Sequence, residues 1–243
     1  MAVEETQDGQ SSAIISSNGS NWTTASTRLL SPVVSSCINC SSINSVVNAN
    51  IQSVSCISTN NCIVVGNIYS SQVGNSKVGF ISYTTNGGTS WSESTIPPSI
   101  QTLTSVSCQN LGKCIASGIT DSSNKLQLGS PVMLISLDAG ITWKFLSYIN
   151  NVNTLTDLKC FNNTCLATGI QFEVSNPTSP DNTLNVTQSE VLESLDGGVS
   201  WHSIASVESG NELLSIDCET ADTCIAGGTE DNYEKGILIY GSI

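Results

Sequence analysis

Four acidic residues carry the side chains that could serve as acid and base in catalysis. Asp121, Asp157, Glu190 and Asp217 offer carboxylates from which a glycosidase could take a facing pair. Asp157 lies three residues before a cysteine and Asp217 one residue before another, so strand alternation predicts that both point to the same side of equivalent strands. A solvated strand position is the simpler interpretation of each acid, and we predict no catalytic residue.

Other reactive side chains are scarce. His202 is the only histidine and directly follows Trp201; no nucleophile accompanies it to form a Ser-His-Asp triad, so we expect a surface strand residue. Carboxylates and carbonyls such as those of "DGG" at 196–198 could bind calcium, but the chain contains no EF-hand or similar calcium loop. We therefore predict no metal ion and no cofactor.

Ten cysteines are the second notable residue type, and eight of them form close pairs. Two cysteines that bracket a tight turn bring facing Cβ atoms within reach of a disulfide, and we predict one bond for each pair. Four-thiolate zinc sites are the alternative, but pairs in successive repeats would not converge on one ion. The pairs are Cys56 with Cys62, Cys108 with Cys114, Cys160 with Cys165 and Cys218 with Cys224.

Cys37 and Cys40 remain, in the stretch "SSCINCSS". We expect a fifth, local disulfide; a redox Cys-x-x-Cys is the alternative, but the Ser-rich surroundings offer no helix start. This pair lies in an insertion over 26–50. Trp22 and Cys56 are 34 residues apart, against 17 for the same interval elsewhere, and the excess is too short for a further four-stranded sheet.

The cysteine pairs belong to an internal repeat. An aliphatic residue lies five positions before each first cysteine, and a glycine lies four positions after each second cysteine. A tryptophan follows the second cysteine by 29 residues in two repeats and by 36 in the third, which indicates a seven-residue insertion near "NPTSPDNTLN". The next repeat's first cysteine follows each tryptophan by 17 residues. The positions are Ile51, Leu103, Leu155 and Leu213, then Gly66, Gly118, Gly169 and Gly228, then Trp91, Trp143 and Trp201.

One repeat contains four strand patterns. The alternating run 103–108, the run 114–120, the apolar run 132–136 and the run 141–147 predict four short antiparallel strands. Four strands in about 52 residues are typical of one blade of a β-propeller. The chain is therefore predicted to be all β, a β-propeller of four or five four-stranded blades, each with a local disulfide, forming one domain over 1–243.

The turn between the third and fourth strands repeats an eight-residue motif: "TTNGGTSW" at 84–91, "SLDAGITW" at 136–143 and "SLDGGVSW" at 194–201. Its acid or amide can accept backbone N–H bonds within the turn, and its glycine can take a positive φ. We expect the tryptophan ring to lie on the fourth strand and to cover the next blade's edge. The turn positions are Asn86, Asp138 and Asp196, then Gly88, Gly140 and Gly198.

The motif resembles the Asp-box, or BNR, repeat S-x-D-x-G-x-x-W. The copies at 136–143 and 194–201 match fully, the copy at 84–91 departs at Thr84 and Asn86, and "SSNGSNW" at 16–22 is one residue short. The resemblance implies a β-propeller whose motifs are structural and peripheral. Propellers of this family include sialidases, which hold the substrate carboxylate with three arginines, and other glycosidases. Arg28 is the only arginine here, so the resemblance does not extend to sialidase activity.

The two ends of the chain are complementary. The last repeat stops after a third strand, while residues 13–25 have the pattern of a third and fourth strand, following a flexible tail over 1–12. We expect 13–25 to complete the last blade, either within the same molecule or on another copy, which would give a head-to-tail filament. A fragment of a longer propeller is the third alternative.

Composition limits the partners. The net charge is −13 with only seven Lys and Arg, which disfavours nucleic acid and anionic membrane surfaces. No apolar run could span a bilayer. The N-terminus shows no signal pattern, so a signal was removed or the chain is a fragment. Paired cysteines favour a secreted or cell-surface protein, and sequons at Asn18, Asn21, Asn39, Asn162 and Asn185 are predicted glycosylation sites.

These observations predict a non-catalytic extracellular or cell-surface propeller. Its function would be binding or assembly as a structural module, its partner a protein, including another copy of itself, or a glycan. The alternative is a glycan-binding protein or a glycosidase-like enzyme of the Asp-box class, which has only the family resemblance in its favour.

Overall fold

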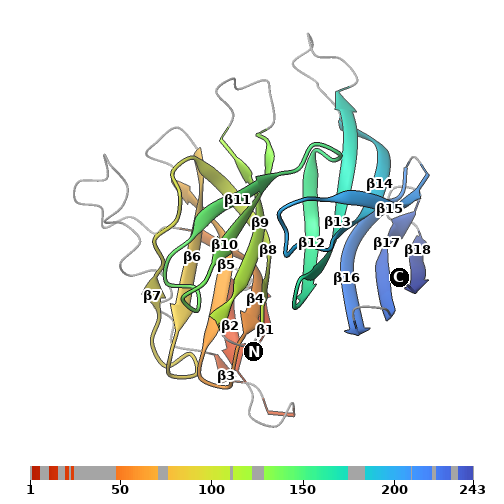
Figure 1. Cartoon of the computed structure of the whole chain (residues 1–243). Helices are drawn as coiled ribbons and strands as arrows, with labels where there is room; N and C mark the ends of the chain where they lie inside the picture. Colours follow the sequence, from red (N-terminus) through yellow and green to blue (C-terminus); the bar gives the residue numbers. More distant parts are fainter. Residues whose placement is uncertain are drawn as a thin grey trace. The chain divides into compact units, whose positions relative to one another are not determined.

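The computed structural model describes residues 2–5, 11–15, 20–21, 23–24, 48–70, 76–109, 112–121, 129–174, 184–208, 210–220, 223–230 and 235–242. The fold is all β, as predicted (Figure 1). The strands are β1 (Ala2–Glu5), β2 (Ser11–Ile15), β3 (Thr23–Thr24), β4 (Asn48–Cys56), β5 (Cys62–Ser70), β6 (Ser76–Thr84), β7 (Ser92–Glu93), β8 (Ile100–Cys108), β9 (Cys114–Thr120), β10 (Pro131–Ser136), β11 (Lys144–Tyr148), β12 (Thr154–Phe161), β13 (Thr164–Val174), β14 (Leu184–Ser194), β15 (His202–Val207), β16 (Glu212–Thr220), β17 (Thr223–Glu230) and β18 (Lys235–Ser242).

Consecutive strands form five small sheets. Sheets β4–β7, β8–β11 and β12–β15 have four strands each, and sheets β1–β3 and β16–β18 have three. Neighbours in sequence are neighbours in every sheet, which is the up-and-down order of propeller blades. The predicted fold class, an all-β propeller of four or five blades, is confirmed. Within the described residues, sheets β1–β3 and β16–β18 have three strands against the predicted four.

The residues divide into two compact units. The first contains residues 1–116 and 135–144, and the second contains 117–134 and 145–243, so that sheet β8–β11 contributes to both. In the first unit β8 packs against β4, β5 and β6, and strands β1 and β2 contact β4. Ser53 and Ser55 of β4 accept hydrogen bonds from the backbone N–H groups of Val106 and Cys108, at 3.4 and 2.9 Å.

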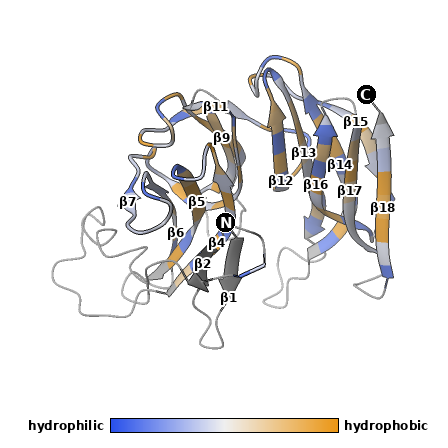
Figure 2. Cartoon of the chain, turned by 90° about the horizontal axis from the view of Figure 1, so that it is seen from below, coloured by the Kyte–Doolittle hydropathy of each residue, from blue (hydrophilic) through white to orange (hydrophobic). Residues whose placement is uncertain are grey.

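In the second unit, sheets β12–β15 and β16–β18 pack face to face through an apolar cluster. Its residues are Leu166, Val191, Leu213, Ile216, Cys218, Cys224 and Ala226. Figure 2 shows apolar residues along β13, β14, β17 and β18 of this unit. Burial of these side chains, at about 25 cal/mol per Å² of apolar surface, stabilises the pair of sheets.

The repeated glycine has a steric cause. The first strands of three sheets carry a register shift at the same place, between Ile51 and Ser53, between Leu155 and Asp157, and between Leu213 and Ser215. The repeated glycine of the second strand lies against this bulge. A Cβ at Gly228 would lie 1.7 Å from the backbone oxygen of Glu212, and one at Gly66 would lie 2.0 Å from that of Asn50. Only glycine fits so close to another backbone.

The strand predictions within one repeat are confirmed with small shifts. The runs 103–108, 114–120 and 132–136 lie in β8, β9 and β10. The fourth strand differs, because β7, β11 and β15 begin after the tryptophan rather than before it. The tight turn extends to the tryptophan, so the extended backbone of the fourth strand starts at the residue after the tryptophan.

The N-terminal segment forms a sheet of its own. Strand β2 pairs with β1 and with β3, so residues 2–5, expected in a flexible tail, are a strand. β2 and β3 have the predicted hairpin order of a third and fourth strand. Cys37, Cys40 and most of the insertion 26–50 lie outside the described residues, which resume at β4.

Candidate functional site

The three eight-residue motifs form tight turns between the third and fourth strands of their sheets. The hydroxyl oxygen of the first motif residue accepts the N–H of the glycine four positions later. These distances are 3.0 Å for Gly88 to Thr84, 2.9 Å for Gly140 to Ser136 and 2.8 Å for Gly198 to Ser194. The three glycines have φ values of 88, 87 and 95°, which glycine adopts without a steric penalty.

The acid of each full motif is held by donors from its own turn. Asp196 accepts bonds from the hydroxyls of Ser194 and Ser200 and from the N–H groups of Val199 and Ser200, at 2.5 to 3.0 Å. The Ser200 hydroxyl is the main cause of the strongly lowered pKa of Asp196. These donors stabilise the ionised form, so the carboxylate is engaged in the turn.

Asp138 is held in the same way. Slight burial raises the pKa of Asp138, but the bonds from Thr142 and Ser136 outweigh it and lower the pKa below its ordinary value. The Thr142 N–H and hydroxyl lie 2.9 and 2.6 Å from the carboxylate. In the departing motif Asn86 replaces the acid, and its side-chain nitrogen donates to the Ser90 hydroxyl at 2.8 Å.

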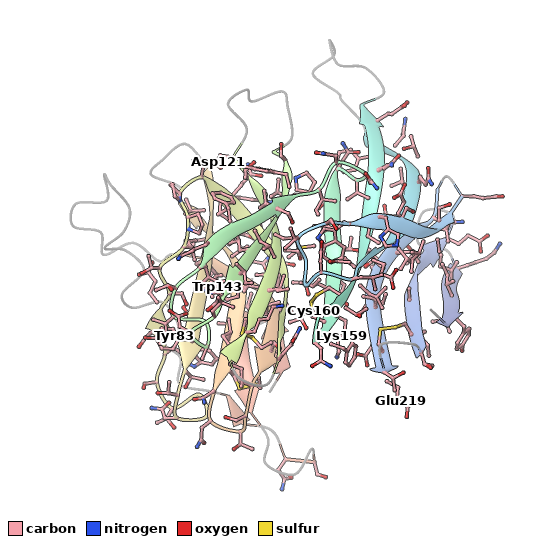
Figure 3. The ribbon with its side chains drawn as sticks, in the orientation of Figure 1. Tyr83, Asp121, Trp143, Lys159, Cys160 and Glu219 are labelled. Carbon is pink, nitrogen blue, oxygen red and sulfur yellow. A yellow bond between two sulfur atoms is a disulfide. The ribbon has the colours of Figure 1, made fainter. Side chains whose placement is uncertain are left out.

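The tryptophans close the turns. The indole N–H groups of Trp143 and Trp201 each donate to the backbone oxygen of the motif glycine, Gly140 and Gly198, at 2.9 Å. Trp91 is buried, and its indole N–H has no hydrogen-bond partner within the part of the chain that the structure describes. Figure 3 labels Trp143 in the first unit.

Two of the turns, 136–143 and 194–201, are also fixed to the sheet that precedes them in the chain. The Ser94 hydroxyl donates to the backbone oxygen of Gly140 at 2.5 Å, and the backbone N–H of Trp143 donates to the backbone oxygen of Thr95 at 2.8 Å. A Cβ at Gly140 would lie 2.5 Å from the Ile63 side chain. In the second unit the Ser147 hydroxyl donates to the Gly198 oxygen at 2.8 Å. The motif therefore packs on the previous sheet, whereas the tryptophan was expected to cover the next one.

Four disulfides join the first and second strands of sheets β4–β7, β8–β11, β12–β15 and β16–β18. They link Cys56 to Cys62, Cys108 to Cys114, Cys160 to Cys165 and Cys218 to Cys224. In three of these sheets the two cysteines are direct partners in the strand register. The disulfide expectation holds for four sheets, and the first sheet's described residues carry no cysteine.

The inner strands of the second unit use two of the predicted acids as contacts between sheets. The Asp157 carboxylate accepts bonds from the Ser215 hydroxyl at 2.8 Å and from the Ile216 N–H at 2.9 Å. Asp217 pairs with Lys159 at 2.7 Å, and this lysine is the main reason that the pKa of Asp217 is lowered. Both acids therefore join β12 to β16.

The other two acids lie in different surroundings. Asp121 is exposed directly after β9, at the end of that strand opposite Cys114 (Figure 3). Glu190 is buried on β14, at the position that Phe80 and Val132 occupy in other repeats, eleven residues before the tryptophan. One of its carboxylate oxygens accepts a bond from Gln171 at 3.1 Å, and the other is buried with no partner among the described residues.

Glu193 is an acid that sequence reasoning missed. It is buried on β14, and one of its oxygens lies 3.0 Å from Nε2 of the exposed His202. Its second oxygen has no hydrogen-bond partner in the described ranges. The two residues are register partners on β14 and β15. Nothing in the sequence distinguished this glutamate from a solvated one, because the burial comes from the neighbouring sheet.

Strand β18 is the edge strand of the last sheet among the strands that the structure describes. Strand β18 pairs with β17 along its whole length, from Glu230–Lys235 to Thr223–Ser242, and lies at the end of the strand order. The equivalent third strands β6, β10 and β14 each carry a fourth strand on that side. An unpaired edge offers a row of backbone donors and acceptors to another strand.

The predicted glycosylation sites lie partly within the described residues. Asn21, Asn162 and Asn185 are exposed, and their glycosylation stays a prediction; Asn18 and Asn39 lie outside the described residues. Among the described residues, no group of three or more His, Cys, Asp or Glu side chains is placed to hold a metal ion. The described part of the chain contains no helix long and apolar enough to cross a membrane.

Comparisons with known proteins identify the fold. No protein-family model matches the chain, and no curated protein matches it. A solved structure of an unknown-function protein from Dyadobacter fermentans is similar, with a TM-score of 0.54, 13% identity and coverage of 93% of this chain and 65% of that one. An ancestral GH74 enzyme has a TM-score of 0.50 at 14% identity, over 81% of this chain and 28% of its own.

The phage phi92 endosialidase has a TM-score of 0.52 at 17% identity, over 81% of this chain and 36% of its own. The chain thus spans about two thirds or less of these structures. At such identities the likeness establishes the fold alone. It nevertheless contradicts the prediction that the chain is not an enzyme, because proteins named as enzymes are among its structural neighbours. That prediction is withdrawn, and the chain is a β-propeller similar to propellers that include glycan-processing enzymes.

Proposed function

We propose that the chain is an Asp-box propeller, secreted or exposed on the cell surface, that works as a binding and assembly module. The open edge of β18 carries this proposal. Among the described strands β18 lies at the edge of its sheet, and such an edge can accept a strand from a partner through backbone hydrogen bonds. The four disulfides support a location outside the reducing cytoplasm.

The proposed partner is another copy of the chain, through its N-terminal hairpin. Residues 13–25 have the sequence pattern of a third strand, turn and fourth strand, and β18 is the third strand of its sheet and lies at the edge of the described strands. β2 and β3 pair as such a hairpin. Addition of this hairpin to β18 of the next copy would be head-to-tail, which gives a filament unless the ring of subunits closes.

A competitor peptide tests strand addition on the intact protein. The full chain is examined by sedimentation velocity at rising concentration, with and without an excess of a peptide of residues 11–25. We expect concentration-dependent association that the peptide suppresses and that a scrambled peptide leaves unchanged. A chain that stays monomeric and does not bind the peptide would rule out assembly at this edge.

Activity on glycans is the second candidate function, favoured by the likeness of the fold to the GH74 enzyme and the endosialidase. Asp121 and Glu190 are the acids to test, because Asp157 and Asp217 are engaged between strands. A screen for release of sugar from polysaccharides and sialylated glycans would detect it. Turnover that Asp121→Asn or Glu190→Gln abolishes at unchanged thermal stability would place this function first.

A further inference from the structure

In the motif at 84–91, Asn86 replaces the acid of the two full motifs, and Gly87 follows it. An asparagine before a glycine can lose its side-chain amide through attack by the chain itself. The backbone nitrogen of the glycine forms a bond to the side-chain carbonyl carbon, and the side-chain nitrogen leaves as ammonia with the proton of that N–H. Water then opens the succinimide ring to give aspartate or isoaspartate. Glycine favours the attack because it has no Cβ to crowd the nitrogen.

The turn already has the donors that an aspartate at position 86 needs. Oδ1 of Asn86 accepts the Ser90 N–H at 2.9 Å, and in a full motif Oδ1 of Asp138 accepts the Thr142 N–H at 2.9 Å. Nδ2 of Asn86 donates to the Ser90 hydroxyl at 2.8 Å, at the place where the Thr142 hydroxyl donates to Asp138 at 2.6 Å. A hydroxyl can donate as well as accept, so conversion to aspartate reverses one hydrogen bond and removes none.

The nitrogen that would attack is held by another turn of the same sheet. The Gly87 N–H donates to the backbone oxygen of Asn60 at 3.0 Å, and Asn60 lies in the loop that the disulfide between Cys56 and Cys62 closes. To reach the side-chain carbon of Asn86, this nitrogen must leave the Asn60 oxygen. The closed loop therefore opposes the reaction.

Hydrogen bonds within the loop 56–62 keep the Asn60 oxygen in place. The Ile57 N–H donates to the Asn61 oxygen at 2.8 Å. The Ser58 hydroxyl accepts the N–H groups of Asn60 and Asn61 at 3.3 and 3.1 Å. The loop is therefore ordered by its own polar contacts as well as by the disulfide.

The same contact between turns recurs in both full motifs. The Ala139 N–H donates to the Gly112 oxygen at 2.9 Å, and the Gly197 N–H donates to the Asn163 oxygen at 2.7 Å. Both acceptors lie between the paired cysteines of their own repeats. Of these three contacts, an asparagine precedes the held nitrogen only in the motif at 84–91, so only there can ammonia be lost.

We propose that Asn86 is a deamidation site whose reactivity is controlled by the disulfide loop 56–62. While the loop is closed, the Gly87 nitrogen stays bonded to it and the reaction is slow. When the disulfide is reduced, the loop opens more often, the nitrogen is released and Asn86 converts. This modification is independent of the proposed assembly function.

The turn distinguishes the two products. Aspartate at position 86 completes the full motif and keeps its hydrogen bonds. Isoaspartate adds a methylene group to the backbone between Thr84 and Gly88, which displaces the Gly88 N–H from the Thr84 hydroxyl that it contacts at 3.0 Å. The aspartyl form should therefore melt as the variant Asn86→Asp does, and the isoaspartyl form should melt at a lower temperature.

Removal of one disulfide at a time tests the control by the loop. Cys56→Ser with Cys62→Ser removes the disulfide of this loop. Cys108→Ser with Cys114→Ser is the matched control, because it removes another disulfide of the same compact unit and leaves the loop 56–62 intact. The full chains are incubated at mildly alkaline pH, and peptide mass spectrometry follows residue 86 separately from Asn18, which also precedes a glycine.

We expect deamidation at residue 86 to be about tenfold faster or more in the first double variant than in the control, because the rate follows the population of the open loop. Ser58→Ala loosens the loop with the disulfide intact and should accelerate the reaction less, which provides a test if the double variant does not fold. Equal rates in the loop variants and the control would overturn the control by the loop. An Asn86 that stays intact in every variant would overturn the site itself, and an aspartyl form less stable than Asn86→Asp would overturn the match to the full motif.

Discussion

At the scale of single residues, the acids of this protein divide by what surrounds them. Asp138 and Asp196 lie in turns that supply several donors each, and their pKa values are lowered as a result. Asp157 of β12 is held by β16, and Asp217 of β16 is held by Lys159 of β12. A carboxylate engaged by several protein donors is poorly suited to general acid or base chemistry, so these four acids are primarily structural.

The acid of the eight-residue motif can be tested by reciprocal substitution. Asp138→Asn replaces an acceptor for the Thr142 hydroxyl by an amide, and we expect a loss of about 1 kcal/mol. Asn86→Asp would let the Ser90 hydroxyl donate instead of accept, and should be neutral or stabilising. Thermal unfolding measures both; equal effects of the two substitutions would contradict the charge-dependent part of this account.

The pH dependence of stability follows from the lowered pKa values. A carboxyl whose pKa is lower in the folded protein stabilises it above the unfolded pKa of about 3.9, and this contribution is lost as the pH falls toward the folded pKa. We therefore expect the melting temperature to fall below about pH 4. The double variant Asp138→Asn, Asp196→Asn should show a shallower fall in thermal scans between pH 6 and pH 2.

At the scale of elements, the bulge of the first strand requires the glycine opposite it on the second strand. Gly228→Ala would bring a Cβ against the Glu212 oxygen, where backbone rather than a flexible side chain must move. We expect a loss of at least about 2 kcal/mol. Gly241→Ala is the control, since a Cβ there meets nothing within 4 Å, and denaturant unfolding compares the two.

The contact between inner strands offers a second test at this scale. Asp157→Ala would remove the acceptor for the Ser215 hydroxyl and the Ile216 N–H, at a cost of about 2 kcal/mol. Asp157→Ser should restore part of the lost stability, because the Ser53 hydroxyl accepts the Val106 N–H at the equivalent place in the first unit. If serine is no better than alanine in thermal unfolding, the contact between strands is not what the acid provides.

At the scale of the whole molecule, stability comes from repetition of a small sheet that has its own cross-link. Each disulfide closes a loop with a sequence separation of 5 or 6 residues, and the loop-entropy relation assigns about 2 kcal/mol to each. Reduction should therefore lower the melting temperature by more than 10 °C, an order-of-magnitude figure. Thiol counting by mass under non-reducing denaturing conditions should find none of the eight paired cysteines free.

Much of this architecture was readable before the structure. The spacing of Cys, Gly and Trp predicted the sheets, three of the four strands of a repeat and the disulfide partners, because these features are local and recur. The predicted fourth strand began too early, at 141, whereas β11 begins at Lys144. The role of the motif as a contact to the preceding sheet was also missed, since Ile63 and Gly140 are far apart in sequence.

By itself the sequence determined the repeating unit: a periodic pattern selects the strands, glycine allows the bulge and the turn, and paired cysteines bracket each first hairpin. Only the tertiary structure decided which acids are engaged in contacts between strands. Asp157 and Asp217 join β12 to β16, and Glu193 is buried. The physical reason is that burial depends on the neighbouring sheet, and a strand's own alternation of apolar and polar residues does not record which neighbour it has.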